Sequence, residues 1–454
     1  MKILMTGATG WIGKSLGIEI IKRGHSLVCL VRDIQSAKIL CPFPAEFIEW
    51  KNVNEPFDDS SLNKVDAIVN LLGESISSKR WNKNIKEQIL SSRIDSTTHL
   101  VNFAKKSQVK SFINASAIGF YGDRGDENLN EESTAGNGFL AEVCQQWEEK
   151  TFSISSQCRC VALRIGVVLG FDGGALEKII PTYRHGFGGK IGNGKQWISW
   201  IHILDLKNLI IEALENENLK GPINATAPTP VTQKDFSKAL GKSLRRPSFF
   251  KVPKFILKII LGEMSEFILS SLKVLPEKAL NLGFQFKYKD IKSAFNDIVK
   301  TNNFSEQNLV AFQYIDKPIE EVFSFYSNEY NLEIITPSFL NFKVLGKTTS
   351  SIQENTLINY QLSLHGIPVK WQSKILNWNP PNNFVDTQTK GPYKKWHHTH
   401  KFERLGSGTL ILDHVVYKVP FGVIGYLFAG WKVNSDVKKI FSYRNKIISQ
   451  YFKI

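Results

Sequence analysis

A run of glycines and small residues near the N-terminus restricts the fold of this chain more than any other feature. It spans residues 6–13, TGATGWIG, between a short apolar run and a helical pattern. In a strand–turn–helix context, Gly7 permits a tight turn, Gly10 lets the backbone approach a pyrophosphate, and Gly13 lets the helix pack against the strand. The backbone amides and the helix dipole then face the phosphates. We therefore expect a dinucleotide to be bound by Gly7, Thr9, Gly10, Trp11, Ile12 and Gly13.

Short apolar runs alternate with helical patterns over the first 120 residues, which is typical of buried parallel strands joined by helices. A further helical pattern covers residues 136–156, and an apolar strand over residues 160–170 follows it. This alternation predicts an α/β fold with a doubly wound parallel Rossmann sheet. The expected strands are residues 2–6, 26–31, 67–72 and 111–116, and the expected helices are residues 12–22 and 85–105.

The residue at the tip of the second strand indicates which coenzyme is bound. This strand ends at Arg32, where a carboxylate would accept the ribose 2′-hydroxyl of NAD and an arginine suits the 2′-phosphate of NADP. The sequence therefore predicts NADP(H). Asp33 follows directly, which keeps NAD(H) as an alternative.

The sequence changes character twice after residue 245. Residues 249–297 contain an amphipathic helical pattern over residues 252–271 and predict a separate helical segment. The polar stretch at residues 301–305 is the expected boundary between an N-terminal domain, residues 1–300, and a C-terminal domain, residues 305–454.

The C-terminal domain is strand-rich. Gly, Pro and Asn turns separate its apolar-polar runs as in an antiparallel meander, and residues 424–452 read as one long amphipathic helix. The expected strands are residues 357–366, 369–378, 383–390, 395–404 and 408–419.

Composition restricts the compartment and the partners. The five cysteines are scattered without a CxxC pair, and no apolar stretch is long enough to span a bilayer, so we expect a reducing, cytoplasmic setting. The net charge of +15 falls mainly after residue 241 without a dense basic block interleaved with aromatics, which argues against nucleic acid. Peripheral contact with an anionic membrane and the oligomeric state stay open.

The order of several motifs resembles one family. TGATGWIG, NLLGESI, ASAIGFYG, LRIGVVLG and GKQWISWIHILDL are similar to the atypical extended short-chain dehydrogenase/reductases of the epimerase-like group. The helical segment over residues 249–297 resembles the small C-terminal cap of that group and is called the cap segment below. The resemblance covers about residues 1–298. It implies that Arg32 holds the phosphate end of the coenzyme and that the cofactor cleft is lined by Leu72, Gly73, Glu74 and Arg80.

The catalytic residues of that superfamily are incomplete in this chain. Its active members use a serine with Tyr-x-x-x-Lys, in which the lysine lowers the pKa of the phenol. Ser116 matches the serine, but Phe139 and Val143 stand at the expected dyad positions. Either other groups perform the chemistry, or the protein is a non-catalytic NADP(H)-dependent sensor or carrier. The candidate catalytic residues are Ser116 and Tyr121, with the carboxylates Asp126, Glu127 and Glu142 as further substitutes.

Residues 305–454 resemble a second group, the SRPBCC or START-like helix-grip superfamily. The motifs that carry this are PIEEVF, LSLHGIPVKW, WNPP, GPY and WHHTHKF, with the closing helix. The resemblance implies a curved antiparallel sheet around the helix and a cavity for a hydrophobic small molecule. His398 and His400 alternate with His397, so one strand offers two ligands where a structural metal site needs four, and no metal is predicted.

Overall fold

The computed structural model describes residues 1–453, except residues 63, 78, 172, 300–305 and 365. The chain forms two compact units, Met1–Ile34 with Ala45–Lys300, and Gln35–Pro44 with Thr301–Ile454. The expected domain boundary at residues 301–305 lies outside the described residues.

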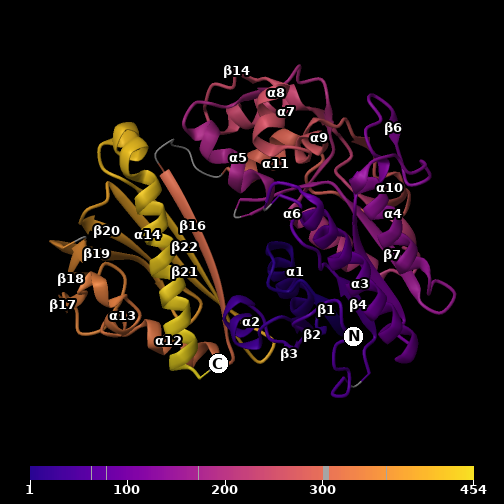
Figure 1. The fold of residues 1–454 in the computed structure, drawn as a ribbon. Coiled ribbons are helices and arrows are strands. Elements are labelled where there is room, and N and C mark those ends of the chain that lie inside the picture. The colour runs from indigo at the N-terminus through magenta and orange to yellow at the C-terminus, as the bar shows by residue number, and fades with distance from the viewer. Residues whose placement is uncertain (63, 78, 172, 300–305, 365, 454) are drawn as a thin grey trace. The chain divides into compact units, whose positions relative to one another are not determined.

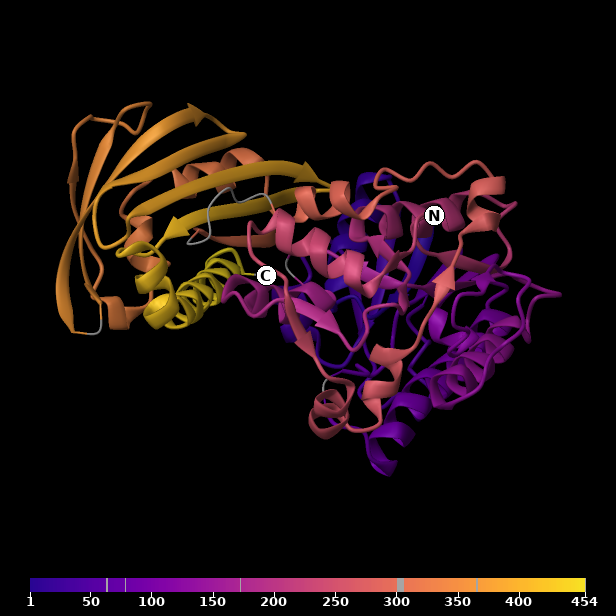
Figure 2. The ribbon, with the colours of Figure 1, turned by 90° about the horizontal axis from the view of Figure 1, so that it is seen from above.

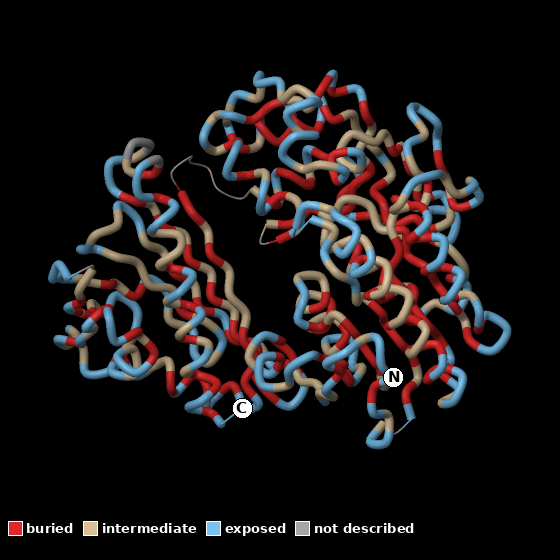
Figure 3. Tube along the Cα trace, viewed as in Figure 1, coloured by how far each residue is buried: buried red, intermediate tan, exposed pale blue. Residues whose placement is uncertain are grey.

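The first unit is built on a parallel, Rossmann-like sheet of seven strands, as the alternation of apolar runs and helical patterns predicts (Figure 1). Its strand order is β12-β7-β5-β4-β1-β2-β3, so the direction of winding reverses between β1 and β4. Almost every residue of the central strands is buried, which agrees with their unbroken apolar composition (Figure 3). The strands are β1 Lys2–Thr6, β2 Ser26–Val31, β3 Glu46–Glu49, β4 Ala67–Asn70, β5 Ser111–Ala117, β7 Arg159–Ile165 and β12 Gly221–Ala225.

Helices follow the strands in the predicted places. Helix α1, Trp11–Lys22, packs beside α6, Ile203–Glu215, and α3, Lys83–Lys106, packs beside α4, Phe139–Phe152. Leu100 of α3 joins the hydrophobic cluster that includes residues of β1 and β4. The remaining helices before the cap segment are α2 Ile34–Leu40, η1 Ile118–Tyr121, α5 Gly174–Arg184 and α7 Gln233–Ser243.

Four pairs of short strands lie outside the main sheet. They are β6 Asn128–Leu129 with β15 Lys273–Val274, β8 Val167–Leu169 with β11 Trp200–His202, β9 Gly189–Ile191 with β14 Phe250–Val252, and β10 Trp197–Ile198 with β13 Val231–Thr232.

The cap segment differs from the prediction at one point. The helical pattern over residues 252–271 is divided at Gly262, whose φ of 61° a helix does not accommodate. Because glycine adopts this conformation without a steric penalty, one expected helix becomes two. The helices of this segment are α8 Lys254–Leu261, α9 Met264–Leu269, α10 Glu277–Asn281 and α11 Ile291–Ile298.

The second unit is an antiparallel sheet of seven strands in the order β16-β22-β21-β20-β19-β18-β17. The long helix α14, Gly422–Tyr451, lies across one face of the curved sheet (Figure 2). Phe441 of this helix packs with Leu309, Val415 and Tyr417 of the sheet. The strands are β16 Glu306–Ile315, β17 Lys343–Lys347, β18 Leu357–Leu364, β19 Ile367–Asn379, β20 Asn383–Lys390, β21 Lys395–Leu405 and β22 Gly408–Lys418, and the short helices are α12 Ile319–Tyr326, α13 Asn331–Ile334 and η2 Ser338–Leu340.

The predicted meander and closing helix are therefore confirmed in this unit, because every expected strand appears within a few residues of its predicted bounds. Within the described residues, none of the helices combines the length and the apolar character needed to cross a bilayer.

Candidate functional site

The glycine turn leaves no room for side chains. Gly7 has a φ of 70°, and a Cβ there would lie 2.9 Å from the carbonyl oxygen of Leu71. A Cβ on Gly13 would lie 2.2 Å from the carbonyl oxygen of Gly7, so any larger residue would force the helix away from the strand. The backbone N–H of Gly10 donates to that same oxygen at 3.0 Å, which closes the turn. Helix α1 then begins at Trp11 without a side-chain cap, so its first amides face outward as an anion site requires.

The turn lies where ligands bind in open parallel sheets. Strands β1 and β4 are neighbours at the reversal of strand order, and the segments that follow them meet at their carboxyl ends. Thr6 joins the two strand ends, because its hydroxyl donates to Asn70 Oδ1 and accepts from the backbone N–H of Leu71 at 3.2 Å. The bare turn and the segment after β4 therefore lie together at the edge of the sheet where the coenzyme cleft is expected.

Arg32 directly follows β2, at the same edge of the sheet. Its side chain is 69% exposed, and one of its guanidinium nitrogens lies 4.0 Å from a carboxylate oxygen of Glu74. A weakly paired, exposed guanidinium at this position is suited to a phosphate. The roles of Arg32 and Glu74 in coenzyme binding stay predictions.

The other predicted cofactor residues fall into two groups. Leu72 and Gly73 line a cavity of about 200 Å³ after β4, and a Cβ on Gly73 would touch the guanidinium of Arg93. Arg80 instead lies against the cap segment, where a Cβ on Gly262 would come within 2.8 Å of its Nε. Thr9 is exposed in the turn. The role of Arg80 in coenzyme binding stays a prediction. In this structure Arg80 contacts the cap segment.

Trp11 lies against a glycine-rich loop. A Cβ on Gly170 or Gly173 would touch its indole ring at 2.3 and 2.5 Å, so those glycines allow the loop to pack on the tryptophan.

One of the two positions of the missing dyad lines the cavity. Val143 of α4 lines it, whereas Phe139 packs its ring against Trp81 at a centroid distance of 5.4 Å. Among the described lining residues, no tyrosine and no lysine is present. Burial raises the pKa of the lining thiol Cys144 to about 11, so this thiol stays protonated at neutral pH. The remaining polar side chains in the lining include Arg93 and Ser116.

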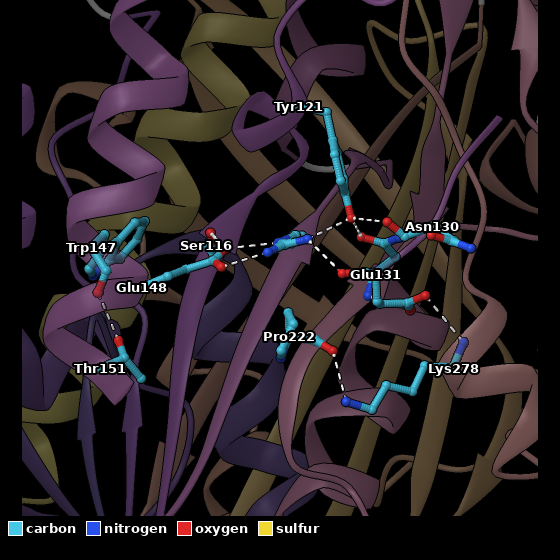
Figure 4. A network of polar contacts seen from close by, with 11 residues as sticks. Ser116, Tyr121, Asn130, Glu131, Trp147, Glu148, Thr151, Pro222 and Lys278 are labelled. Atoms are coloured by element: carbon cyan, nitrogen blue, oxygen red, sulfur yellow. Dashed lines mark hydrogen bonds and ion pairs between the residues drawn. The ribbon is translucent and has the colours of Figure 1, made fainter. Parts of the chain in front are cut away.

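The two candidate catalytic residues belong to one buried network (Figure 4). The hydroxyl of Ser116 donates to Glu148 Oε1 at 2.6 Å. Glu148 accepts two hydrogen bonds from Arg164, from Nε at 3.0 Å and from Nη2 at 2.8 Å. Arg164 Nη1 in turn donates to the hydroxyl of Tyr121 at 2.8 Å. Ser116 lines the cavity as well, so the network reaches the cavity at that residue.

Tyr121 is fully buried at the far side of this network. Its hydroxyl contacts Asn224 Oδ1 and the carbonyl oxygen of Asn130, both at 2.8 Å. Burial raises its pKa to about 12, an effect that the charge of Arg164 only partly offsets. The phenol therefore keeps its proton at neutral pH, and its contacts position neighbouring groups. A catalytic role for Tyr121 stays a prediction.

The network contains residues that the sequence did not identify. Glu148 and Arg164 share a buried, two-point ion pair, and Arg164 also lies 3.5 Å from the ring centroid of Phe120. The signal that was available is an arginine inside the apolar strand over residues 160–170, because a charge in a buried strand requires a partner.

The alternative carboxylates have other contacts. Asp126 accepts from the indole N–H of Trp197 at 2.8 Å, Glu127 pairs with Arg124 at 2.7 Å, and Glu142 lies in the first turn of α4.

The second unit contains a separate cavity of about 170 Å³ under its sheet. His398 and His400 line it, together with the carboxylate of Asp386, which the sequence analysis did not single out. Burial, followed by the neighbouring His400, lowers the pKa of His398 to about 4. The apolar part of the lining includes Phe325, Leu332, Phe342, Tyr360, Trp371, Trp378, Phe384 and Trp396.

The fold and the glycine turn define a dinucleotide-binding protein of the Rossmann type. A profile described as the NAD dependent epimerase/dehydratase family matches residues 3–225, and a domain of unknown function, DUF1731, matches residues 252–298. Epimerase family protein SDR39U1 homolog, chloroplastic, from Arabidopsis thaliana is 41% identical over 311 residues, which are 66% of this chain and 87% of that protein. The chain belongs to the NAD dependent epimerase/dehydratase family, and the first resemblance is thereby confirmed.

Solved structures agree with this assignment. A human epimerase family protein, SDR39U1 isoform 2, was solved with NADPH; it is 30% identical, with a TM-score of 0.61, over 66% of this chain and 100% of that one. A nucleoside-diphosphate sugar epimerase from Corynebacterium glutamicum is 33% identical, with a TM-score of 0.53, over 66% of this chain and 58% of that one. The coenzyme in the human protein is the one that Arg32 predicts for this chain.

Proposed function

We propose that residues 1–300 bind NADP(H) as an epimerase-like or oxidoreductase-like protein acting on a small molecule. The observation that carries the proposal is the glycine turn. A side chain at Gly7 or Gly13 would clash with the backbone, and no side chain caps the start of α1. The human relative solved with NADPH supports the same coenzyme.

Each part of the cleft has a distinct task in this proposal. The amides at the start of α1 hold the pyrophosphate, Arg32 holds the 2′-phosphate, and Leu72 and Gly73 shape the wall beside the cavity. NADPH supplies a hydride when it is bound. The residues of the chain bind and orient the coenzyme and the small molecule. The buried hydroxyl of Tyr121 keeps its proton and therefore does not act as a base at neutral pH.

The cofactor proposal is tested by calorimetry on Arg32→Ala. We expect the affinity for NADPH to fall about tenfold or more, since a charge-assisted hydrogen bond contributes about 1.5–3 kcal/mol, and the affinity for NADH to stay unchanged. Lys51→Ala removes an equally exposed positive charge next to β3 and is the matched control. Equal losses for both coenzymes would refute the choice of NADP(H), and no binding of either would refute the site.

A non-catalytic sensor or carrier is the second candidate, and the cavity lining favours it. Where a Tyr-x-x-x-Lys dyad would supply the proton, the described lining offers Arg93, Ser116 and a protonated Cys144. NADPH oxidation with a panel of carbonyl compounds distinguishes the two functions. Turnover by the native chain supports the enzyme, whereas tight binding without turnover, also in Phe139→Tyr/Val143→Lys, supports the sensor or carrier.

We also propose that the second unit is a helix-grip domain of the SRPBCC or START-like type that binds a hydrophobic small molecule. The curved sheet, the helix α14 and the aromatic cavity support this proposal. A cavity of about 170 Å³ accommodates a molecule about as large as one aromatic ring, since an engineered cavity of about 150 Å³ binds benzene. A longer lipid requires the walls to move.

Fluorescence titration with iodobenzene, a single aromatic ring that carries a heavy-atom quencher, tests this second binding site. We expect quenching of tryptophan emission that is reduced in Trp396→Phe, because Trp396 lines the cavity, and unchanged in Trp50→Phe, which lies in the core of the first unit. Equal quenching in the native chain and both variants would contradict the proposed pocket.

A further inference from the structure

Four ionisable side chains meet on the inner face of the antiparallel sheet. Asp386 of β20 pairs in register with His398 of β21, and His400 of β21 pairs with Asp413 of β22. His398, His400 and Asp413 are each 4% exposed, and the ring of Phe384 stacks on His400 at a centroid distance of 4.0 Å. Because neighbouring strands supply the carboxylates, the two-ligand limit that argued against a metal in the sequence does not apply.

The two carboxylates stand on opposite sides of the imidazole pair. Asp413 Oδ1 lies 2.9 Å from His398 Nε2 and 2.7 Å from His400 Nδ1. Asp386 Oδ2 lies farther from the other two ring nitrogens, 3.2 Å from His400 Nε2 and 3.8 Å from His398 Nδ1. His398 Nε2 forms a hydrogen bond with Asp413 and His400 Nε2 forms one with Asp386, whereas the close approach of His400 Nδ1 to Asp413 has no hydrogen-bond geometry. In the tautomers in which the ring N–H groups face Asp413, both lone pairs face Asp386.

The atoms on the Asp386 side are close enough for an ion to bring them together, although they are spaced more widely than in a closed metal site. Bonds of about 2.0–2.2 Å in tetrahedral geometry place ligand atoms about 3.3 Å apart. One donor atom from each of Asp386, His398 and His400 lies within 4.8 Å of the others. Asp413 corresponds to the outer carboxylate that orients metal-bound imidazoles.

The charges in this part of the cavity also call for a cation. With neutral imidazoles, Asp386 and Asp413 carry two negative charges, and the buried Arg444, which lines the same cavity, carries one positive charge. Glu329 is matched by Lys347 at 2.6 Å and leaves this balance unchanged. An anionic ligand would add to the buried negative charge, whereas a proton or a divalent cation compensates it.

We propose that Asp386, His398 and His400 bind a divalent first-row transition-metal ion of the zinc type, with Asp413 as the residue that positions both imidazoles. The three ligands line the cavity, so a fourth position opens toward it, as in sites where an ion also binds water or a ligand. Two histidines with one carboxylate form a recurrent ligand set for such ions. The inference goes beyond the proposed hydrophobic ligand and holds whether or not that ligand binds.

Calorimetry with Zn²⁺ on chelator-treated, tag-free full-length protein at pH 7.5 tests the site. We expect one ion per chain, and an affinity at least about tenfold lower in Asp386→Asn, His398→Gln and His400→Gln. His397→Gln is the matched control, because His397 lies on the same strand and points to the opposite face. The control is expected to bind like the native chain.

A second measurement decides the question even when the variants fail to fold. The Co²⁺ derivative of the native chain is expected to show two paramagnetically shifted, solvent-exchangeable imidazole N–H signals in proton NMR, one for each ring whose second nitrogen faces Asp413. Absence of Zn²⁺ binding, binding lost equally in His397→Gln, or fewer than two such signals would overturn the proposal.

Discussion

The protein contains two buried ionic clusters that differ in how their charges are compensated. In the first unit, Glu148 and Arg164 neutralise each other through two hydrogen bonds. The hydroxyl of Ser116 donates to Glu148, and the hydroxyl of Tyr121 accepts from Arg164. In the second unit, the carboxylates exceed the fixed cations by one. The difference teaches that the first, closed cluster is complete without a ligand, whereas the second, open cluster is completed by a proton or, as we propose, by a bound cation.

The largest expected effect comes from opening the closed cluster. Glu148→Gln or Arg164→Met alone should lower the free energy of unfolding by about 3–5 kcal/mol, because each leaves a buried charge unpaired. The double variant Glu148→Gln/Arg164→Met should cost less than the sum of the single variants, since no charge remains. Urea unfolding of the four proteins measures this coupling. Strictly additive costs would show that the pair is not a closed unit.

The next effect comes from filling the open cluster. Zn²⁺ at about 100 times its dissociation constant should raise the free energy of unfolding of the second unit by about 2.7 kcal/mol. In Asp386→Asn the same addition should have little effect, because the variant lacks one ligand and one surplus charge. Thermal unfolding with and without Zn²⁺ measures both, and a similar gain in the variant would contradict the comparison.

A smaller effect is expected from the phenol at the end of the closed cluster. The pKa of Tyr121 is raised to about 12 from about 10, so the unfolded chain loses this proton first and stability falls between about pH 10 and pH 12. At pH 11 the loss is about 1.4 kcal/mol. Tyr121→Phe should remove that part of the alkaline decline and leave the pH dependence between pH 6 and pH 9 as it is in the native chain. An unchanged alkaline slope in the variant would show that the phenol is not held neutral.

The smallest effect is expected from Ser116→Ala. The ion pair stays intact, so the loss is about 1 kcal/mol for one hydrogen bond. Binding of NADPH, measured by calorimetry, should change little. A loss of turnover without a loss of binding would instead support the catalytic role predicted for Ser116.

The sequence predicts the first unit well because its signals are local. Gly7 and Gly13 indicate a backbone that leaves no room for side chains, and short apolar runs between helical patterns indicate parallel strands. The break at Gly262 was missed because a glycine inside an amphipathic pattern is compatible with either a continuous or a divided helix.

The clusters depend on contacts between distant residues. Ser116 and Glu148 are 32 residues apart, and Tyr121 and Arg164 are 43 residues apart, so no local pattern joins them. Asp386 meets His398 only through the pairing of β20 with β21, whose register is set by the packing of the whole sheet. An aspartate in the middle of an alternating strand was the one available sign, and it does not identify its partners.

The zigzag of Asp386, His398, His400 and Asp413 across three strands has a consequence for folding. A shift of β21 by one residue along either neighbouring strand would turn both imidazoles to the outer surface. The two carboxylates would then stay among aromatic rings without a partner. Each unpaired ion would raise the free energy of such a misaligned sheet by several kcal/mol. The sum for the cluster is on the order of the stability of a whole domain. The cluster therefore stabilises one strand register over the others that alternating apolar sequences allow.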